Sequence, residues 1–349
     1  MKKLRTVVAG IGRIGWQYHV PQVVVHDGFE LIGVVDHSTE RLQEAFDEYG
    51  VKGYQDYNEM LENEKPDLIV IATPTLFHAD QAVAAMERGI DVFLDKPMAR
   101  NLKEADRIVE AQQRTGRKVM LYQPHRMTAQ ALVLQEILKK DLIGPIYKMH
   151  VAISNYRRRN DWQSLKKNGG GMLNNYGSHR MDWLLSMADS DIKRIRCNMF
   201  AIATLGDAED VVKIVMETES GMLFELDINE ATAFDLPELV VYGKYGTIKH
   251  VAGENGENHY HVKYFREDGL GDIQLHGELA APQRSYSNFE TIVWNEETFP
   301  IPRREYKDAY YDKCYEYFAL DEAPFVPLEH SYRVMEMLQK CREDAGWAE

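Results

Sequence analysis

The feature that most constrains this chain is a glycine motif near its start, set between two apolar stretches. Residues 6–9 are mainly apolar, residues 10–15 read Gly-Ile-Gly-Arg-Ile-Gly, and a second apolar stretch ends at Asp36. An isolated G-x-G-x-x-G is a weak signal. Here a strand-like segment precedes it, a helix-like segment follows it, and an acidic residue closes the next strand about 20 positions on. The combination predicts a dinucleotide site.

Each glycine of this motif has its own physical task. Gly10 permits a tight turn, Gly12 lets the backbone approach a pyrophosphate, and Gly15 lets the following helix pack closely on the strand. The phosphates then meet the N–H groups at a helix N-terminus. A glycine-rich turn in a protein that binds no nucleotide is the plainer alternative, and the flanking pattern disfavours it.

Asp36 indicates which dinucleotide to expect. A carboxylate at the end of the second strand accepts hydrogen bonds from an unmodified adenosine ribose and repels a 2′-phosphate, so the sequence favours NAD over NADP. Arg13 and Arg41 lie close enough in sequence to weaken that preference, because a guanidinium binds phosphate well.

Length and charge argue against several classes of protein. The chain has 349 residues, which suits two domains, and a formal net charge of −14 from 41 basic and 55 acidic residues. No block of basic residues is interleaved with aromatics, so we expect no nucleic-acid partner. No apolar run approaches the roughly 18 residues of a membrane span, and the first strand begins too early for a signal peptide. With three scattered cysteines, these features predict a cytoplasmic protein without a membrane partner.

The first third of the chain alternates strands and helices. Strands are predicted at 6–9, 31–36, 67–73, 91–94 and 118–122, with helices at 39–49, 56–62, 78–88 and 102–115. Repeated βα units predict a doubly wound parallel sheet, whose ligands bind at the carboxyl ends of the strands. The residues expected at those ends are Gly10, Asp36, Thr73, Pro74, Thr75, Asp95, Lys96, Pro97 and Gln123.

After Gly144 the pattern changes to strands without regular helices. Predicted strands cover 146–155, 192–204, 210–217, 222–229, 238–242 and 247–250, many with alternating apolar and polar residues. Residues 254–302 are rich in turns and stay unassigned, and a helix is predicted over 330–342. The predicted domains are 1–124 for NAD binding, 125–327 for substrate binding and oligomer contacts, and 328–349 for a C-terminal helix that packs back on the first domain.

Several linked motifs give the chain a resemblance to a known family. Asp95-Lys96-Pro97 resembles the Glu-Lys-Pro signature of the Gfo/Idh/MocA oxidoreductases, and residues 169–182 resemble their second signature, Gly-Gly-Gly-x-Leu-x-Asp-x-Gly-x-His-x-x-Asp. With Thr73-Pro74 and His78, the resemblance covers nearly the whole chain. It implies a Rossmann domain followed by an α/β domain with a large open, mainly antiparallel sheet that often forms the oligomer contact. It also implies NAD(P)-linked chemistry on sugars, inositols or related polyols.

Lys96 is the expected acid/base of that chemistry. Oxidising a secondary alcohol removes the hydroxyl proton as hydride leaves the carbon, so a proton acceptor must lie beside the nicotinamide. A lysine has an ordinary pKa of ~10.4, which burial or the nicotinamide cation lowers. Pro97 restricts the residue before it to an extended backbone and so fixes where the lysine points. Most lysines are surface residues, but the strand-end position and the signature favour catalysis here.

Asn175 and His179 follow the triple glycine on a helix predicted over 173–187. They are four residues apart and share one helix face. His179 is expected to contact a substrate hydroxyl and to share proton transfer with Lys96, although a satisfied histidine on a core-facing helix is the plainer alternative. Asp182 is expected either to orient the His179 ring or to serve elsewhere on the helix.

Asn175 departs from the signature, which has aspartate at that position. Asparagine carries no charge and takes up no proton, yet it holds a sugar hydroxyl through both a donor and an acceptor. Proton transfer then falls to Lys96 and His179, and the expected catalytic set is Lys96, His179 and Asn175.

Further ligand contacts are expected around these residues. Trp162 offers an apolar face to a sugar ring, Tyr156 and the arginines at 157–159 precede it, and Arg126 follows the last strand of the first domain. A solvated charge run with a core tryptophan is an equal alternative. The expected substrate-binding residues are Lys96, Arg126, Tyr156, Trp162, Asn175 and His179. The expected cofactor-binding residues are Gly10, Gly12, Arg13, Ile14, Gly15, Asp36, His37, Arg41, Thr73, Pro74, Thr75, His78, Asp95, Lys96 and Gln123.

Together these observations predict an NAD-dependent oxidoreductase acting on a sugar, glycoside or polyol. One alternative is a redox-cycling NAD-dependent glycoside hydrolase or lyase, which releases no net NADH. Another is a non-catalytic NAD-responsive regulator, which the presence of Lys96 and His179 disfavours. The open face of the second sheet predicts a homodimer or homotetramer. No histidine has a partner at a known ligand spacing, so no metal is expected.

Overall fold

Two sheets organise the chain, which the computed structural model describes over residues 3–273, 275, 290–303 and 309–347. The first part contains β1 (Leu4–Ala9), η1 (Gly15–His19), α1 (Val20–Val25), β2 (Phe29–Val35), α2 (Thr39–Tyr49), β3 (Lys52–Tyr54), α3 (Tyr57–Glu64), β4 (Leu68–Ile71), η2 (Thr75–Phe77), α4 (His78–Glu87), β5 (Asp91–Leu94), α5 (Leu102–Thr115) and β6 (Val119–Leu121). The second part contains η3 (Pro124–Met127), α6 (Ala129–Leu138), β7 (Ile146–Ser154), η4 (Trp162–Ser164), η5 (Lys166–Asn168), η6 (Leu173–Gly177), α7 (Ser178–Ser186), β8 (Ile192–Phe200), β9 (Val211–Thr218), β10 (Leu223–Asn229), β11 (Leu239–Gly243), β12 (Gly246–Val251), η7 (Glu254–Gly256), β13 (His259–Tyr264), η8 (Glu267–Gly269), β14 (Asn295–Pro300), α8 (Ala309–Leu320) and α9 (Leu328–Asp344).

The first sheet is a doubly wound parallel sheet with strand order β3-β2-β1-β4-β5-β6. All of its strand pairs are parallel, and every residue of β4 is buried, as expected for a strand covered on both faces by helices. The order reverses direction beside β1, so the carboxyl ends of β1 and β4 meet at the point where such sheets bind ligands. The glycine motif follows β1 directly.

Helix α8 belongs to the core of this first sheet, although its sequence lies in the range 125–327 expected for the second domain. Its buried aromatic side chains pack with Phe29 and Phe93, and the Tyr310 hydroxyl donates a hydrogen bond of 2.6 Å to the Leu121 carbonyl. The chain therefore returns to the first sheet after completing the second. No helix was predicted in this stretch from the sequence.

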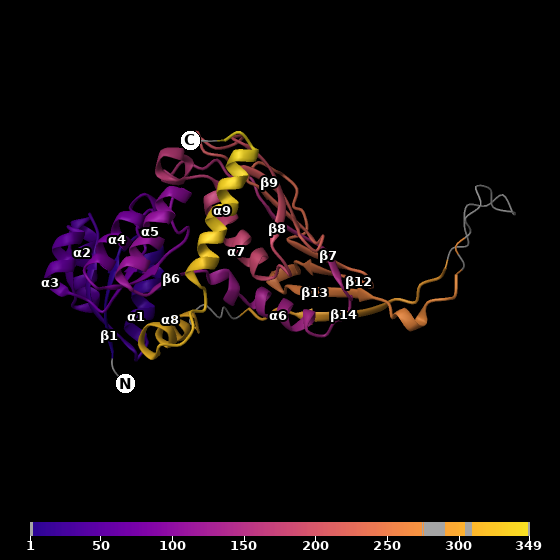
Figure 1. The fold of residues 1–349 in the computed structure, drawn as a ribbon, viewed down its shortest axis with the longest axis horizontal. Helices are drawn as coiled ribbons and strands as arrows, with labels where there is room; N and C mark the ends of the chain where they lie inside the picture. The colour runs from indigo at the N-terminus through magenta and orange to yellow at the C-terminus, as the bar shows by residue number, and fades with distance from the viewer. Residues whose placement is uncertain (1–2, 274, 276–289, 304–308, 348–349) are drawn as a thin grey trace.

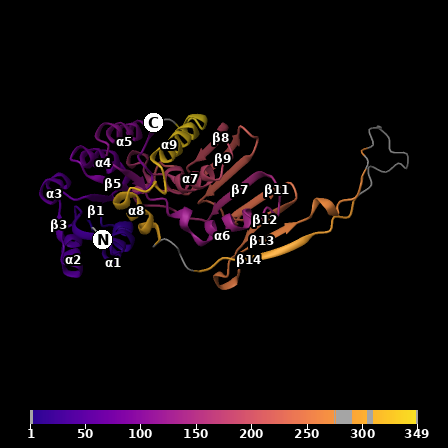
Figure 2. The ribbon, with the colours of Figure 1, turned by 60° about the horizontal axis from the view of Figure 1, so that its bottom comes forward.

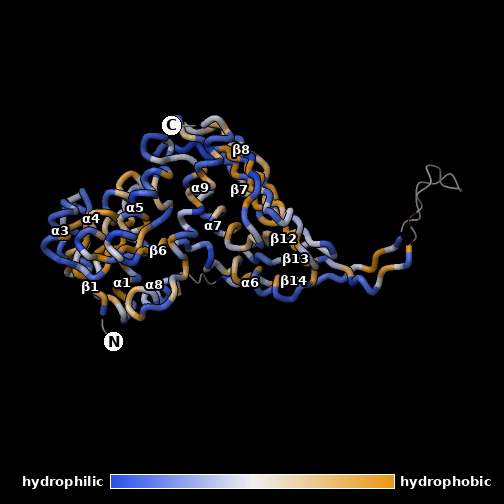
Figure 3. The backbone as a smooth tube through the Cα atoms, viewed as in Figure 1, coloured by the Kyte–Doolittle hydropathy of each residue, from blue (hydrophilic) through white to orange (hydrophobic). Residues whose placement is uncertain are grey.

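The second sheet has eight strands in the order β14-β13-β12-β11-β7-β10-β9-β8. Only the β7–β10 pair is parallel, so the sheet is mainly antiparallel. Strands β9 and β10 alternate buried and half-buried residues, and Figure 3 shows hydrophobic and hydrophilic residues interleaved along this sheet. Helices α6, α7 and α9 lie on one face (Figure 2), while the other carries ion pairs such as Lys148–Glu225 and Lys213–Asp227.

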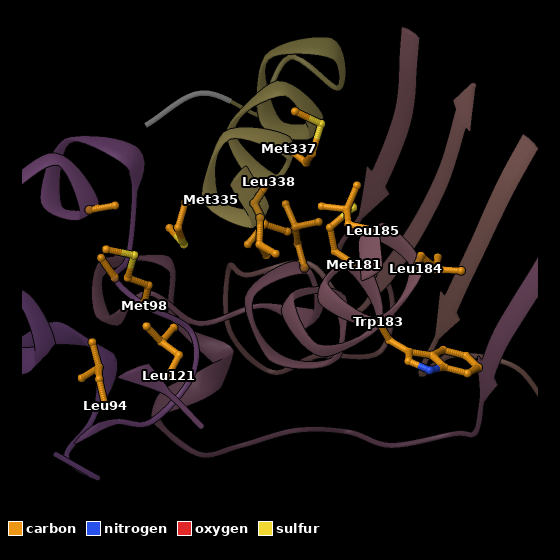
Figure 4. Packing of buried hydrophobic residues seen from close by; sticks show 14 of the residues in the cluster. Leu94, Met98, Leu121, Met181, Trp183, Leu184, Leu185, Met335, Met337 and Leu338 are labelled. Atoms are coloured by element: carbon orange, nitrogen blue, oxygen red, sulfur yellow. The ribbon is translucent and has the colours of Figure 1, made fainter. Parts of the chain in front are cut away.

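Helix α9 lies between the two sheets, as Figure 1 shows. Its buried side chains Met335 and Leu338 share one apolar cluster with Leu94 of the first sheet and Met181 of α7 (Figure 4). The Tyr332 hydroxyl also donates to Asp106 of α5 over 2.7 Å. The predicted C-terminal helix therefore contacts both parts of the molecule.

Strands β13 and β14 pair along the edge of the second sheet, within residues 254–302 that the sequence left unassigned. The rest of that stretch lies partly outside the described residues. Across the described ranges, no helix combines the length and apolar character needed to cross a bilayer.

Candidate active site

The three glycines of the motif meet different surroundings. Gly10 has φ of +84°, and a Cβ there would lie 2.6 Å from the Thr73 nitrogen. A Cβ on Gly15 would lie 1.9 Å from the Gly10 carbonyl oxygen, so internal packing requires both glycines. The nearest atom to a Cβ on Gly12 is the Arg41 Nη1, at 3.9 Å. Packing within the protein therefore does not explain Gly12, which stays a predicted point of approach for a pyrophosphate.

Asp36 lies beside this loop and fastens it. One carboxylate oxygen accepts from the Ile11 N–H over 3.1 Å and the other from the Ser38 N–H over 3.0 Å. Arg41 Nη1 lies 3.3 Å and His37 Nδ1 3.2 Å from the same carboxylate. The side chain predicted to bind a ribose thus also holds the turn, and a guanidinium lies next to it. Arg13 and Ile14, at the start of the following helix, are exposed.

His78, predicted to contact the cofactor, lies between two backbone carbonyls. It is buried, its Nδ1 lies 2.9 Å from the Pro97 carbonyl oxygen, and its Nε2 lies 2.8 Å from that of Thr73. His78 therefore joins the loops that follow β4 and β5 and positions them. Of the neighbouring candidates, Pro74 is exposed and Thr75 is buried.

Lys96 follows β5 and reaches the second part of the molecule. Its Nζ donates to the Asn175 side-chain oxygen over 3.1 Å and to the Asn175 carbonyl over 3.2 Å. Burial lowers the pKa of Lys96 to about 8; Asp95 opposes this shift, and Arg13 and Arg159 add to it. The Lys96–Pro97 peptide is cis, and the Lys96 N–H donates to the Asp95 carboxylate over 2.7 Å.

A buried carboxylate that the sequence analysis did not identify holds the start of the η6–α7 segment. Glu209 accepts from the Leu173 N–H over 2.9 Å, and burial raises the pKa of its carboxyl. Gly171 has φ of +102°, and a Cβ there would lie 2.2 Å from a Glu209 oxygen. The glycine loop is therefore packed tightly against this carboxylate. The contact fixes the position of the η6 segment, which carries Asn175. Sequence spacing offers no sign of a partner so far along the chain.

His179 lies one helical turn beyond Asn175 and is 8% exposed. Its Nδ1 lies 3.3 Å from the Gln123 side-chain oxygen, and its ring stacks on His125. Burial lowers the pKa of His179 well below its ordinary value, and the nearby cations Lys96 and Arg180, together with His125, add to this. Gln123, predicted as a cofactor contact, thus contacts the histidine.

Asp182 does not orient His179, contrary to one of the roles considered for it. It is fully buried and accepts from Arg126 Nε over 2.7 Å and from Arg126 Nη2 over 2.9 Å. His330 of α9 lies 3.2 Å from the same carboxylate. Arg126, expected at the substrate, commits two of its donors to this pair, because a fully buried carboxylate needs a charged partner.

The segment before the glycine loop places its aromatic residues at the surface. Tyr156 is 64% and Trp162 38% exposed, and neither has a hydrogen bond or ring contact with Lys96 among the described residues. Arg159 is 9% exposed, lies 3.8 Å from the buried carboxylate of Glu230, and is near enough to Lys96 to lower its pKa. Arg159 was among the arginines considered as ligand contacts, whereas its partner Glu230 was not predicted.

Comparisons with known proteins agree with this arrangement. Residues 4–123 match a family model described as an oxidoreductase family with an NAD-binding Rossmann fold, and residues 132–249 match the GFO/IDH/MocA C-terminal domain. Inositol 2-dehydrogenase of Salmonella paratyphi B is 26% identical over 242 residues, covering 67% of this chain and 70% of that enzyme. D-glucoside 3-dehydrogenase of Escherichia coli is 27% identical over 187 residues, 51% of this chain and 52% of that enzyme. The WlbA dehydrogenase of Bordetella pertussis, solved with NADH and UDP-GlcNAcA, shares the fold with a TM-score of 0.78 at 21% identity, over 99% of this chain and 97% of that one.

Proposed function

Since the chain belongs to the Gfo/Idh/MocA oxidoreductase family, we propose that it transfers hydride between NAD and a secondary alcohol of a sugar, glycoside or polyol. The observation that carries the proposal is Lys96, a partly buried lysine whose amine has a pKa of about 8 and hydrogen-bonds to Asn175 across the two parts of the molecule. Such a group exchanges protons near neutral pH. The named relatives inositol 2-dehydrogenase and D-glucoside 3-dehydrogenase support the substrate class.

The glycine loop fits NAD. Gly12 offers backbone that a pyrophosphate can approach, Gly10 and Gly15 keep the turn tight, and Asp36 lies at the ribose end. Bound NAD supplies the carbon centre that accepts or returns hydride. Lys96, at the carboxyl end of β5, takes the hydroxyl proton as its neutral amine. His179 holds a substrate hydroxyl, and Asn175 keeps the lysine in place and completes the hydroxyl contacts.

The pKa of Lys96 sets the direction of the pH dependence. The lysine accepts a proton only when it is neutral, and its neutral fraction rises as the pH rises through about 8. Alcohol oxidation should therefore accelerate over that interval, and ketone reduction, which needs the protonated lysine, should slow.

The direct test is turnover of NAD with a panel of inositols, free sugars and glycosides, followed by absorbance of the reduced cofactor. Accumulation of NADH with at least one of them supports the proposal. Cleavage of a glycoside without net NADH identifies the redox-cycling alternative instead. A protein that binds NAD but transforms none of the panel is a regulator.

Asn175→Asp should move the pH profile of oxidation to higher pH. A carboxylate 3.1 Å from the Lys96 amine favours its charged form and raises its pKa. Asn175→Ala should instead raise KM for the alcohol several-fold and leave the Kd for NAD nearly unchanged, because it removes a substrate contact and the side-chain hydrogen bond to Lys96 but leaves the glycine loop untouched. Steady-state kinetics from pH 6 to 10 (about two units either side of that pKa) measure both. An unshifted profile for Asn175→Asp would show that Lys96 does not limit the reaction.

Asp36→Ala should narrow the preference of the protein for NAD over NADP, because it removes the carboxylate that repels a 2′-phosphate. Arg41→Ala is the matched variant: it removes the neighbouring guanidinium, keeps Asp36, and should weaken NADP binding. Calorimetric titration of the wild type and both variants with each dinucleotide gives the six affinities. If the wild type prefers NADP, the assignment of Asp36 to the ribose is wrong.

We also propose that the chain forms a homodimer or homotetramer through the face of the second sheet that its helices leave open. That face carries residues of β7, β9 and β10, and its ion pairs, such as Lys213–Asp227 at 2.7 Å, suit a self-complementary contact. Light scattering at micromolar concentration should give the mass of two or four chains, and a monomer would contradict the proposal.

A cytoplasmic location is proposed as well, to be checked by cell fractionation.

A further inference from the structure

The segment that follows β6 contacts helix α7 at three successive points. The Gln123 side-chain oxygen lies 3.3 Å from His179 Nδ1, the His125 ring covers the His179 ring, and Arg126 forms the two-pronged pair with Asp182. The Arg126–Asp182 pair is almost completely buried, so it fixes the segment against the helix. The buried Arg126–Asp182 pair therefore holds the rings of His125 and His179 against each other.

The two imidazoles are close and parallel. Their centroids are 4.1 Å apart and their planes differ by 4°. Two like charges at about 4 Å repel strongly even at an effective dielectric constant of about 20, so the pair cannot hold two protons near neutral pH and titrates as a unit. The amide oxygen of Gln123 accepts from Nδ1–H and so selects one neutral tautomer of His179. Nε2 of His179 has no hydrogen bond to the described residues and keeps its lone pair.

We propose that His125 is a positioning residue for the oxidoreductase reaction: stacked on His179 and anchored through Arg126, it keeps His179 neutral with Nε2 available as an acceptor. The proposal rests on the proposed function, in which His179 binds a substrate hydroxyl. It assigns to His125 a role that neither the glycine motif nor the Asp-Lys-Pro motif indicates.

The cationic groups around His179 all lower its pKa. Lys96 from the loop after β5, His125 from η3 and Arg180 from α7 itself all add to burial in lowering the pKa of His179. Arg180 pairs with Glu238 over 2.9 Å, and the nearest carboxylate on α7, Asp182, is taken by Arg126 and His330. Of the three groups that add to burial in lowering the pKa of His179, His125 is the one whose ordinary pKa lies near neutrality, so removing it gives the cleanest test.

The experiment compares His125→Phe, which keeps a stacked ring without a charge, with His125→Ala, which removes both. Histidine ring resonances of the full-length protein, followed by NMR during a pH titration, report the pKa of His179 without any substrate. In His125→Phe that pKa should rise by at least about one pH unit. In His125→Ala, kcat should fall about tenfold at every pH, the cost of a misplaced ring. His261→Phe, at an exposed histidine of β13, should leave both measurements unchanged.

The outcomes separate this proposal from the proposed function. If the wild type produces NADH and His179 titrates at the same pH in His125→Phe, the positioning role is refuted and the function stands. If the His179 pKa rises but no alcohol is oxidised by the wild type, control of His179 by His125 stands and the function is refuted. Should His125→Phe fail to fold, His125→Gln removes the same charge and carries the same expected shift.

Discussion

Lys96→Met should lower turnover by about 100-fold or more, the usual contribution of a general acid or base. Methionine keeps much of the side-chain length and suits a buried position, so the loop after β5 should keep its shape. What is lost is the amine that hydrogen-bonds to Asn175 and takes the hydroxyl proton. The Kd for NAD should change little, because the glycine loop and Asp36 are untouched. Kinetics and calorimetric titration of the same preparation measure the two effects.

The control is Lys139→Met, at a lysine whose side chain is 69% exposed and whose amine pairs with Glu136. It should retain wild-type turnover and NAD binding. Near-normal turnover of Lys96→Met would remove this lysine from the mechanism and leave His179 as the remaining candidate. A parallel loss of NAD affinity would instead show that Lys96 contributes mainly to the cofactor site.

Gly12→Ala should weaken NAD binding without destabilising the protein, whereas Gly15→Ala should destabilise the fold. A Cβ on Gly12 finds no atom closer than 3.9 Å, so the unliganded protein should keep its stability. The methyl group then occupies the path of the pyrophosphate, and the Kd for NAD should rise about tenfold or more. A Cβ on Gly15 meets the Gly10 carbonyl oxygen at 1.9 Å, so helix and strand must separate. The free energy of unfolding should fall by about 1–3 kcal/mol.

Urea denaturation without ligand and calorimetric titration with NAD measure these two effects separately. Gly269→Ala is the control, because a Cβ there meets no atom of the described residues within 4 Å. If Gly12→Ala binds NAD as tightly as the wild type, the dinucleotide does not lie against this loop. If Gly15→Ala is as stable as the wild type, the helix is less tightly packed than the structure shows.

The alternation of strands and helices made the first sheet predictable. A continuous apolar run such as Leu68–Ile71 is typical of a buried parallel strand. The residues that end each helix and strand lie next to it in the sequence. Strands β13 and β14 were missed because their pairing joins segments about thirty residues apart across turn-rich sequence. Helix α8 was missed for a related reason. Its neighbouring tyrosines, Tyr310 and Tyr311, are both buried, which blurs the one-sided pattern of an amphipathic helix.

The residues of the candidate site were predictable where they lie at the carboxyl end of a predicted strand. Lys96 comes directly after β5, and the structure places it on Asn175, 79 residues away. The partners of the other residues were not predictable, because they come from distant segments. Arg126 takes Asp182, and Glu209 holds the start of the helix that carries His179. Single-sequence spacing contains no information on such pairs.

The apolar cluster that joins α9, α7 and the first sheet makes the two parts of the molecule one thermodynamic unit. Relative motion of domains is the usual expectation where their interface is small and polar, but here Met335 and Leu338 are buried in the same cluster as Leu94 and Met181. Unfolding either sheet would expose the packing surface of the other, so both should melt together. NAD bound at the glycine loop then raises the melting temperature of a sheet that it never touches.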